Sequence, residues 1–425
     1  MSLWSSPYRR RWLLWGVLAA SFLLVNVYRL STAVIAEDLM TAFRTTGTQL
    51  GTLHATFFFV YAAMQIPTGV LVDRIGPRLT AATGAVVMNL GAIWFALASG
   101  YGGALVGRLL IGLGGSVIFV SMLRFSANWF RADEFATLNG LSFAVGGVGG
   151  ILATTPFALL VGATGWREAV LALAVVGLVF AVATALFVRD TAERAGFAPI
   201  DGATEQSRLT VAEVRTSLAV ILRDRWTWIV SLLLFCTGGV NLTLFGLWGI
   251  PFVVQIYDVS VTAASTITLL GGAGLVVGPP VIGRLSDRLD RRSELIVAGT
   301  VVYAALLGAI AVLGEPPLAF VGVAFFLAGA LLGSFVLTYP MIKERNPSRA
   351  SGISLGTING ASFFGAAAFP SIMGWTLDAY WTGEMVGGVR VYTLTGYRIA
   401  FAIAAGAGVV SVACATWVHW NEPGR

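Results

Sequence analysis

Long apolar stretches alternate with short polar segments along the whole chain. A stretch of about 20 apolar residues is long enough to cross the roughly 30 Å hydrocarbon core of a bilayer as a helix. A helix also satisfies its own backbone polar groups, as lipid requires. The pattern predicts an all-α integral membrane protein with about twelve transmembrane helices, near residues 12–34, 49–71, 80–98, 103–125, 137–160, 167–188, 226–254, 262–283, 294–313, 318–341, 352–376 and 397–418.

The two halves of the chain resemble each other. Residues 69–78 read GVLVDRIGPR and residues 283–292 read GRLSDRLDRR, while TLNGLSF at 137–143 is matched by TINGASF at 357–363. Because the matches keep their order, they indicate a duplicated unit with six helices in each half, arranged as two pseudo-symmetric bundles.

The expected organisation has three parts. An N-terminal six-helix bundle covers 1–188, a linker covers 189–225, and a C-terminal six-helix bundle covers 226–425. Within the linker, Thr210 and Glu213 have the spacing of a capping box, and the residues after them mix apolar and basic positions. We predict a short amphipathic helix there, lying on the membrane surface.

The composition excludes a soluble protein. Of the 425 residues, 57% are hydrophobic and 11% are charged, whereas a soluble domain has about 25% charged residues. The cations gather in the segments expected on one side of the membrane, so the positive-inside rule places both termini and the linker in the cytoplasm. We predict a multi-pass protein of the cell (inner) membrane. The net charge of +6 then reflects topology, and no basic soluble face is present to bind nucleic acid.

The sequence offers no support for metal or enzyme chemistry. The two histidines, His54 and His419, and the two cysteines, Cys236 and Cys414, lack the spacing of metal ligands. No buried pair of nucleophile and base is apparent. We therefore predict no metal, no cofactor and no enzymatic activity.

The pattern G-x-x-x-D-R-x-G-x-R stands at the cytoplasmic ends of the second and eighth predicted helices. It resembles the signature loop of the major facilitator superfamily (MFS), although the second copy has Asp290 in place of its glycine. The resemblance implies the MFS fold, a monomer, and transport by alternating access. It also implies that the loop is a latch holding the outward-facing state; a static loop cap is the alternative. The latch residues are Gly69, Asp73, Arg74, Gly76, Arg78, Asp287 and Arg288.

The residues of the loop suit such a role. Gly69 has no side chain, so the end of its helix can press against a helix of the other half. Asp73 is placed to accept hydrogen bonds from the first amides of the next helix and to pair with an arginine. Gly76 permits a tight turn.

Ionisable groups inside the membrane are candidates for function. Arg29 lies about 14 residues before the expected external end of the first helix, or roughly 21 Å along it, near the middle of the bilayer. Asn26 lies one turn below on the same face. The matching position of the seventh helix, Thr243 or Leu244, has no charge. We predict that Arg29 contacts substrate as a cation. The alternative is an internal ion pair or a hydrogen-bonded strut.

Polar and aromatic residues on other helices extend this predicted site. Tyr61 and Gln65 share a stripe with His54 on the second helix, because the three are spaced by seven and four residues. Asn241 and Trp248 are spaced by seven on the seventh helix. Asn359, on the eleventh, lines the cavity or joins helices together. The predicted substrate-binding residues are Arg29, Asn26, Tyr61, Gln65, Asn241, Trp248 and Asn359.

Proton coupling has four candidate residues. His54 titrates near neutral pH, with plain packing as its alternative role. Arg108 opens the fourth helix in GRLLIGLGG, which resembles the arginine motif of the superfamily. That resemblance implies a structural or proton-linked role, with Glu37 or Asp38 as the partner; substrate contact is the alternative. Arg124, near the cytoplasmic edge of the same helix, is expected to snorkel.

Absent groups narrow the substrate class. No carboxylate lies mid-bilayer in the predicted helices, whereas an antiporter of cationic drugs needs one to exchange its proton for the charge of the drug. We predict proton-coupled symport of a small organic anion such as a carboxylate, with protons and membrane lipid as partners; uniport and exchange stay open. One alternative is an exporter of hydrophobic compounds, favoured by the 26 phenylalanines and 13 tryptophans. The other is an MFS-like membrane receptor that senses a ligand.

Overall fold

The computed structural model describes residues 7–131, 134–198, 200, 216, 219–345, 351–386 and 388–422. Helices dominate both halves of the chain. The first half comprises α1 (Pro7–Leu30), η1 (Ser31–Ala33), α2 (Ala36–Phe43), α3 (Gly47–Ala63), α4 (Gln65–Ile75), α5 (Pro77–Leu97), α6 (Tyr101–Ser116), α7 (Ile118–Trp129), α8 (Phe135–Leu152), α9 (Thr155–Thr164) and α10 (Trp166–Phe187).

The second half follows a connection that holds the short η2 (Glu193–Ala195). The residues from Thr210 to Glu213, where the amphipathic helix was predicted to begin, lie outside the described residues. The elements of the second half are α12 (Arg225–Thr243), the π-helix η3 (Leu244–Trp248), α13 (Gly249–Tyr257), α14 (Val261–Leu289), α15 (Arg292–Leu313), α16 (Leu318–Ala330), α17 (Leu332–Val336), α18 (Thr338–Arg345), α19 (Ser351–Ala379), β1 (Trp381–Val386), β2 (Val389–Tyr392) and α20 (Leu394–Trp420).

The helices are long and apolar enough to span a membrane many times. Within the described residues, nine spans meet that description, and there are eleven if two bent helix pairs count as one span each. One pair joins α3 to α4 and the other joins α8 to α9. The helix α19 has 29 residues but is not among these spans. A helical multi-pass protein is therefore confirmed, whereas the predicted count of twelve is not.

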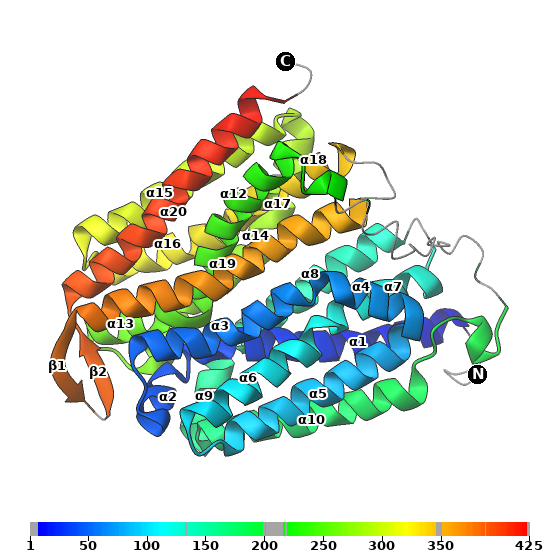
Figure 1. Cartoon of the computed structure of the whole chain (residues 1–425), viewed down its shortest axis with the longest axis horizontal. Coiled ribbons are helices and arrows are strands. Elements are labelled where there is room, and N and C mark those ends of the chain that lie inside the picture. The colour runs from blue at the N-terminus through cyan, green and yellow to red at the C-terminus, as the bar shows by residue number, and fades with distance from the viewer. Residues whose placement is uncertain are drawn as a thin grey trace.

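Helices of each half pack mainly against one another, and the halves meet along a few helices. In Figure 1, α1 to α10 lie in the lower part of the view and α12 to α20 in the upper part. At their boundary α3 packs against α19, and α8 and α9 pack against α14. The hairpin of β1 and β2 lies at one end, which we call the hairpin end. Both chain termini lie toward the opposite end, the terminal end.

Backbones of the two halves come very close together at the hairpin end. A Cβ added to Gly51 of α3 would lie 2.3 Å from the carbonyl oxygen of Pro370 in α19. One added to Gly374 would lie 2.2 Å from the carbonyl oxygen of Gly47. Such close approach requires glycine, as at packed helix crossings inside membranes. We call the contact of Gly47 and Gly51 with Pro370 and Gly374 the glycine seam.

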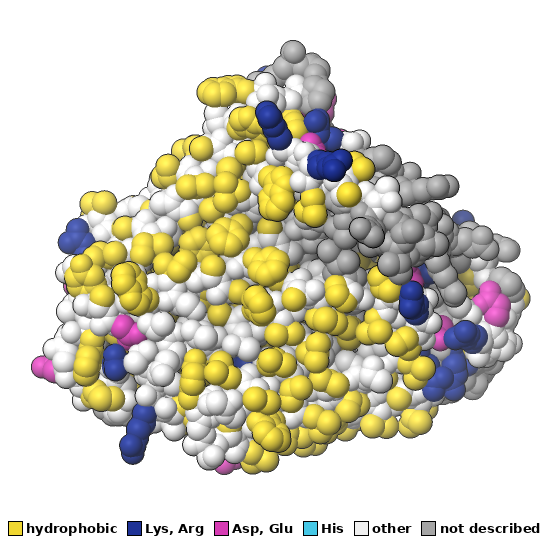
Figure 2. All heavy atoms as spheres, viewed as in Figure 1, with side chains coloured by type: hydrophobic (Ala, Val, Ile, Leu, Met, Phe, Trp, Pro, Cys, Tyr) yellow, Lys and Arg dark blue, Asp and Glu magenta, His cyan; other side chains and the backbone are white. Residues whose placement is uncertain are grey.

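The outer surface is apolar over much of its area. Figure 2 shows hydrophobic side chains spread across the middle of one face, with most charged side chains toward its margins. Large apolar side chains such as Leu97, Val312 and Trp375 are more than 60% exposed. A soluble protein does not expose apolar surface on this scale, so lipid is the solvent that fits this face.

One buried contact fixes the start of α1. Arg11 donates two hydrogen bonds to the Glu134 carboxylate, at 2.9 Å and 2.6 Å, and its side chain is only 8% exposed. Partial burial acts to raise the pKa of Glu134, but the Arg131 amide and the Arg11 guanidinium outweigh it, so the pKa lies below its ordinary value.

Replacing Glu134 by glutamine is expected to destabilise the protein by about 1.5–3 kcal/mol, because it leaves the buried Arg11 charge without its partner. In the wild type this stabilisation is present above the ordinary carboxyl pKa of about 4.3. The stabilisation is lost as the pH falls through the lower pKa that Glu134 has in the folded protein. Thermal unfolding in detergent between pH 7 and pH 3 measures both effects. Arg291→Gln, which breaks the more exposed Arg291–Glu294 pair, serves as the control; an equal loss in both variants would contradict the prediction.

Candidate functional site

Arg29 lies in the last turn of α1, next to the other half of the protein. Its guanidinium donates a hydrogen bond to the side-chain oxygen of Asn26 and lies 6.0 Å from the ring centre of Phe363 on α19. The Asn26 amide in turn donates to the carbonyl of Phe22, at 2.9 Å. The Nε of Arg29 is buried and has no hydrogen-bond partner. The guanidinium is therefore only partly satisfied by the protein.

Tyr61 of α3 faces the same point. Its side chain is 3% exposed and lies close enough to Arg29 for the two groups to interact electrostatically. Its ring packs 4.6 Å from that of Phe363. Arg29, Asn26, Tyr61 and Phe363 thus form one group, which we call the Arg29 cluster. Three of the four were predicted from the sequence.

Phe363 is the member that the sequence analysis missed. It ends the repeated segment TINGASF, whose counterpart in the first half ends at Phe143. Phe143 packs beside Phe119, which packs in turn beside Phe22, at ring distances of 6.0 Å and 4.9 Å. The repeat was therefore the available signal, because it placed matching aromatic rings on matching helices. The cluster draws on both halves of the chain through Phe363.

The other predicted substrate contacts are engaged elsewhere. Asn241 donates to the carbonyl of Ala328 at 2.9 Å, Trp248 donates to that of Pro370 at 3.0 Å, and Asn359 accepts from the Tyr339 hydroxyl at 2.8 Å. Within the described residues, none of the three has a hydrogen bond or ring contact with the Arg29 cluster.

Among the described residues, Gln65 is linked to the cluster only by a hydrogen bond to the backbone of Tyr61. Its amide donates to the carbonyl of Tyr61, at a long 3.4 Å. It begins α4, where the path of the chain bends away from α3. The structure therefore brings Arg29, Asn26 and Tyr61 together, with Gln65 adjacent.

His54 is completely buried at the boundary of the two halves. A Cβ added to Gly246 would lie 2.9 Å from its ring, so the imidazole packs directly on the π-helix η3 of the second half. Neither ring nitrogen has a hydrogen-bond partner of normal geometry, although the backbone of Leu242 lies close enough to interact. Helices of the π type occur mostly as single turns, often at functional sites.

Arg108 lies near His54 and is also buried, at 3% exposure. One nitrogen donates to the carbonyl of Tyr28 at 2.9 Å, and the guanidinium lies 5.5 Å from the ring centre of Phe57. Its Nε and Nη2 have no partner. The pairing with Glu37 or Asp38 expected from the sequence is not found among the described residues, because those carboxylates lie on α2, which caps the hairpin end.

In the first copy of the signature loop, the contacts of Asp73 differ from those predicted. Gly76 adopts a φ of +93°, which glycine tolerates readily. The next helix begins at Pro77, and the amide of Arg78 donates at 2.9 Å to Asp190, beyond the end of α10. Asp190 therefore takes the amide role that had been expected of Asp73. Asp73 instead lies 3.5 Å from Arg124, which pairs rather than snorkels.

The second copy is more open. Asp287 and Arg288 are exposed near the end of α14, and Asp290 ends that helix with a φ of +52°. This φ places Asp290 in the left-handed region that glycine usually occupies. Arg292 pairs with Glu344 of α18 at 2.8 Å.

Between described residues, the hydrogen bonds and ion pairs of Asp73 and Arg78 stay within the first half and the connection that follows it. No atom lies within 4 Å of a Cβ added to Gly69. At the terminal end, every ion pair between two described residues lies within one half or the connection next to it; these are Arg11–Glu134, Asp73–Arg124, Asp190–Arg194, Arg291–Glu294, Arg292–Glu344 and Asp224–Arg345.

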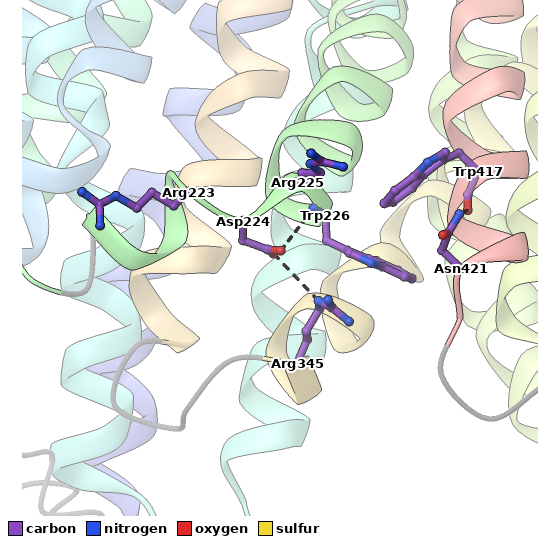
Figure 3. Close-up of a pocket in the computed structure, with 7 residues that line it drawn as sticks. All are labelled: Arg223, Asp224, Arg225, Trp226, Arg345, Trp417 and Asn421. Atoms are coloured by element: carbon purple, nitrogen blue, oxygen red, sulfur yellow. Dashed lines mark hydrogen bonds and ion pairs between the residues drawn. The ribbon is translucent and has the colours of Figure 1, made fainter.

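A separate pocket opens at the terminal end of the second half (Figure 3). Trp226 packs 5.5 Å from Trp417, and Arg345 lies 4.6 Å from the Trp226 ring centre and 3.9 Å from the Asp224 carboxylate. The two tryptophans, Arg345 and Asp224 therefore already have partners within the pocket. The Arg29 cluster, which has an unsatisfied cation, is the better candidate for a substrate site.

Comparisons with known proteins agree with this architecture. A family model described as Major Facilitator Superfamily matches residues 14–250 and again 243–425. The protein named "Probable sulfoacetate transporter SauU" of Cupriavidus necator is 24% identical over 324 residues, covering 71% of each chain. The hexuronate transporter of Bacillus subtilis is 25% identical over 288 residues, covering 67% of this chain and 66% of its own.

Solved structures show the same fold. A bacterial homologue of the human lysosomal transporter Spinster, in an inward-facing and unoccupied conformation, superposes with a TM-score of 0.77. It is 16% identical, and the match covers 97% of both chains.

Proposed function

The chain belongs to the major facilitator superfamily, and on that premise we propose that it carries a small organic anion across the membrane by alternating access. The predictions of family and of a multi-pass membrane location are confirmed by the family model and the apolar helices. Members of this family and the relatives named above are transporters, so the chain is not an enzyme.

The observation that carries the proposal is the incomplete satisfaction of Arg29. A charged group within the membrane is costly unless it is paired. Arg29 has a neutral amide, Asn26, as its hydrogen-bond partner and a buried Nε without one. Within the described residues no carboxylate lies within ion-pairing distance of it. A carboxylate or similar anion on the substrate supplies the missing charge and accepts hydrogen bonds from two nitrogens at once.

The substrate class follows from the surroundings of this cation. Tyr61 and Phe363 present aromatic surface beside the guanidinium, which suits a compact solute with a short carbon skeleton. The relatives are named for sulfoacetate and hexuronate, both organic acids. We therefore favour a carboxylate-bearing solute over a neutral one.

Two features support a state closed at the hairpin end. The glycine seam brings the backbones of α3 and α19 together there, whereas the ion pairs at the terminal end remain within each half. Under alternating access, the site then opens toward the terminal end. The positive-inside rule makes that end cytoplasmic, which corresponds to an inward-facing state of two six-helix bundles with α19 as a twelfth span. A monomer is sufficient for this mechanism.

A ligand panel tests the proposal directly. Purified protein is unfolded by heat in the presence of small carboxylates, sulfonates, sugars and cationic drugs. A ligand at 100 times its dissociation constant is expected to stabilise the protein by about 2.7 kcal/mol. Stabilisation by an organic acid supports the anion site, whereas stabilisation by cationic or neutral lipophiles alone would overturn it.

The aromatic rings near Arg29 favour one second candidate, an exporter of hydrophobic compounds. Phe22, Phe119 and Phe143 form a continuous row of rings. The Phe22 ring and the Asn26 amide both lie within 4 Å of a Cβ added to Gly146. Such a row suits an apolar ligand. The same panel separates the two functions, because an exporter would be stabilised by lipophiles rather than acids.

Proton coupling through His54 makes a further prediction. His54 packs between the halves, with Arg108 near it and the π-helix η3 against its ring. Replacing it by glutamine is expected to abolish uphill, proton-driven uptake while leaving substrate exchange within about threefold of wild type, because exchange needs no net proton movement. Uptake into proteoliposomes with and without an inward proton gradient measures this. His419→Gln, which alters a histidine bonded to Ser293 on another part of the chain, is the control. Retained uphill uptake in His54→Gln would exclude this histidine as the coupling group.

A further inference from the structure

One carboxylate of the second half binds the first turn of a helix in the first half. Asp378, near the end of α19, accepts hydrogen bonds from the amides of Gly47 and Thr48, both at 2.8 Å. It also accepts one from the Thr48 hydroxyl at 2.6 Å. Gly47 and Thr48 begin α3. Three hydrogen bonds from one half therefore converge on a single side chain of the other, at the hairpin end.

The arrangement is favourable because a helix start has free amides and partial positive charge. Thr46 already caps α3 by accepting from the Gln49 amide. Asp378 accepts from the two preceding amides, so the N-terminus of α3 is almost fully satisfied. The Asp378 side chain is 16% exposed, which shields these charge-assisted bonds from water.

Asp378 also has partners in its own half. The Arg390 guanidinium lies 3.3 Å from it and the Tyr392 hydroxyl 3.5 Å; both residues belong to β2. Arg390 lies over the ring of Trp381 at 4.4 Å, and its carbonyl accepts from the Gln255 amide at 3.2 Å. The hairpin is thus fixed to the second half and holds its arginine beside Asp378.

We propose that Asp378 is a partner-switching residue that sets the balance between closed and open states of the hairpin end. With the end closed, its carboxylate binds the start of α3. With the end open, α3 moves away with the first half, and Arg390 and Tyr392 tighten on the carboxylate that remains. Because Arg390 keeps the charge paired in both states, opening does not leave an uncompensated anion.

The two variants at this switch are expected to act in opposite directions. In Asp378→Asn, an amide NH2 faces the donors of Gly47 or Thr48, so the ratio of closed to open protein falls about fivefold (about 1 kcal/mol). In Arg390→Ala both states lose the ion pair, but the closed state keeps the three hydrogen bonds from Gly47 and Thr48. The open state therefore loses more, and the same ratio rises by about that factor. Both substitutions act on the equilibrium between states, so the intrinsic affinity of the Arg29 cluster within either state is expected to stay the same.

Cysteine cross-linking measures the closed population. Thr52 and Ser371 face each other across the seam with their hydroxyl oxygens 3.3 Å apart, so Thr52→Cys with Ser371→Cys forms a disulfide only when the hairpin end is closed. The native Cys236 and Cys414 are buried. Rates of cross-linking are compared in membranes for the pair alone and with Asp378→Asn, Arg390→Ala, or Glu384→Gln on β1 as the control.

Slower cross-linking in Asp378→Asn and faster cross-linking in Arg390→Ala, with the control unchanged, support the switch. Equal rates in all variants, or changes in the same direction at both positions, overturn it. Should Asp378→Asn fail to fold, Thr48→Val takes its place, because it removes only the hydroxyl that donates to Asp378. A cross-linking rate equal to that of the cysteine pair alone then overturns the proposal. The inference rests on alternating access but not on any substrate. Failure of the ligand panel therefore leaves this test intact, and the reverse also holds.

Discussion

Replacing Arg29 by glutamine is expected to reduce uptake of an organic-acid substrate by a factor of about 100 or more. The estimate corresponds to about 2.7 kcal/mol, within the range for removing one partner of a buried, hydrogen-bonded charge pair. Asn26 keeps its own bond to the backbone of Phe22, so the local fold has a partner that does not depend on Arg29. Initial uptake rates in proteoliposomes, at matched protein amounts, measure the loss.

Arg29→Lys provides the matched variant. Lysine keeps the charge but cannot present two parallel donors to a carboxylate, so we expect partial activity between that of wild type and glutamine. Thermal unfolding without ligand checks that both variants fold. Should Arg29→Gln transport the acid as fast as wild type, the cation would be a structural strut and the anion site would have to lie elsewhere.

Adding a single methyl group at Gly51 is expected to slow transport about 10- to 100-fold. A Cβ there would lie 2.3 Å from the Pro370 carbonyl oxygen and 2.6 Å from its carbon. Both atoms are backbone, so relief requires α3 and α19 to separate. Overpacking of this kind costs about 1–3 kcal/mol, and here it falls on the closed state of the hairpin end alone. The expected result for Gly51→Ala is a protein that favours the open hairpin end and completes few transport cycles.

Gly16→Ala is the control for this variant, because no atom lies within 4 Å of a Cβ added there and the residue is likewise inside a helix. It is expected to transport at the wild-type rate. Turnover measured for both variants, together with accessibility of a labelled cysteine at the hairpin end, distinguishes a conformational block from misfolding. A wild-type rate in Gly51→Ala would mean that this end does not need to close so tightly.

Much of the fold was predictable because a helix that crosses lipid needs about 20 predominantly apolar residues in a row. Runs of apolar residues identified nearly all the long helices, and the duplicated loop identified the family. The predicted run at 352–376 likewise coincides with α19, although α19 is not among the nine spans found in the described residues. Its polar and small residues are explained by its position between the halves, where it packs against α3 and not only against lipid.

The site was predictable only as far as it depended on one charged residue. Arg29 was found because ionisable groups inside the membrane-spanning helices are few, and Asn26 and Tyr61 because they share a helical face or stripe with other polar residues. Asn241 was misplaced because helical spacing shows which residues share a face but not which neighbour each contacts. Its hydrogen-bond acceptor is the backbone carbonyl of Ala328. Every residue has a backbone carbonyl, so the sequence does not show which carbonyl accepts a given hydrogen bond. The same limit explains why Asp190 could not be foreseen as the cap for Arg78.

Main-chain atoms form part of the contact between α3 and α19 at the hairpin end. Gly47, Gly51 and Gly374 have no side-chain rotamers to lose when α3 and α19 meet, so forming the seam costs little of the conformational entropy that ordering long side chains would demand. Backbone atoms in van der Waals contact also leave no space for a chain of water molecules. A seal of this kind can form and break at every turnover while remaining tight to ions, which a carrier needs if it is not to dissipate the membrane potential.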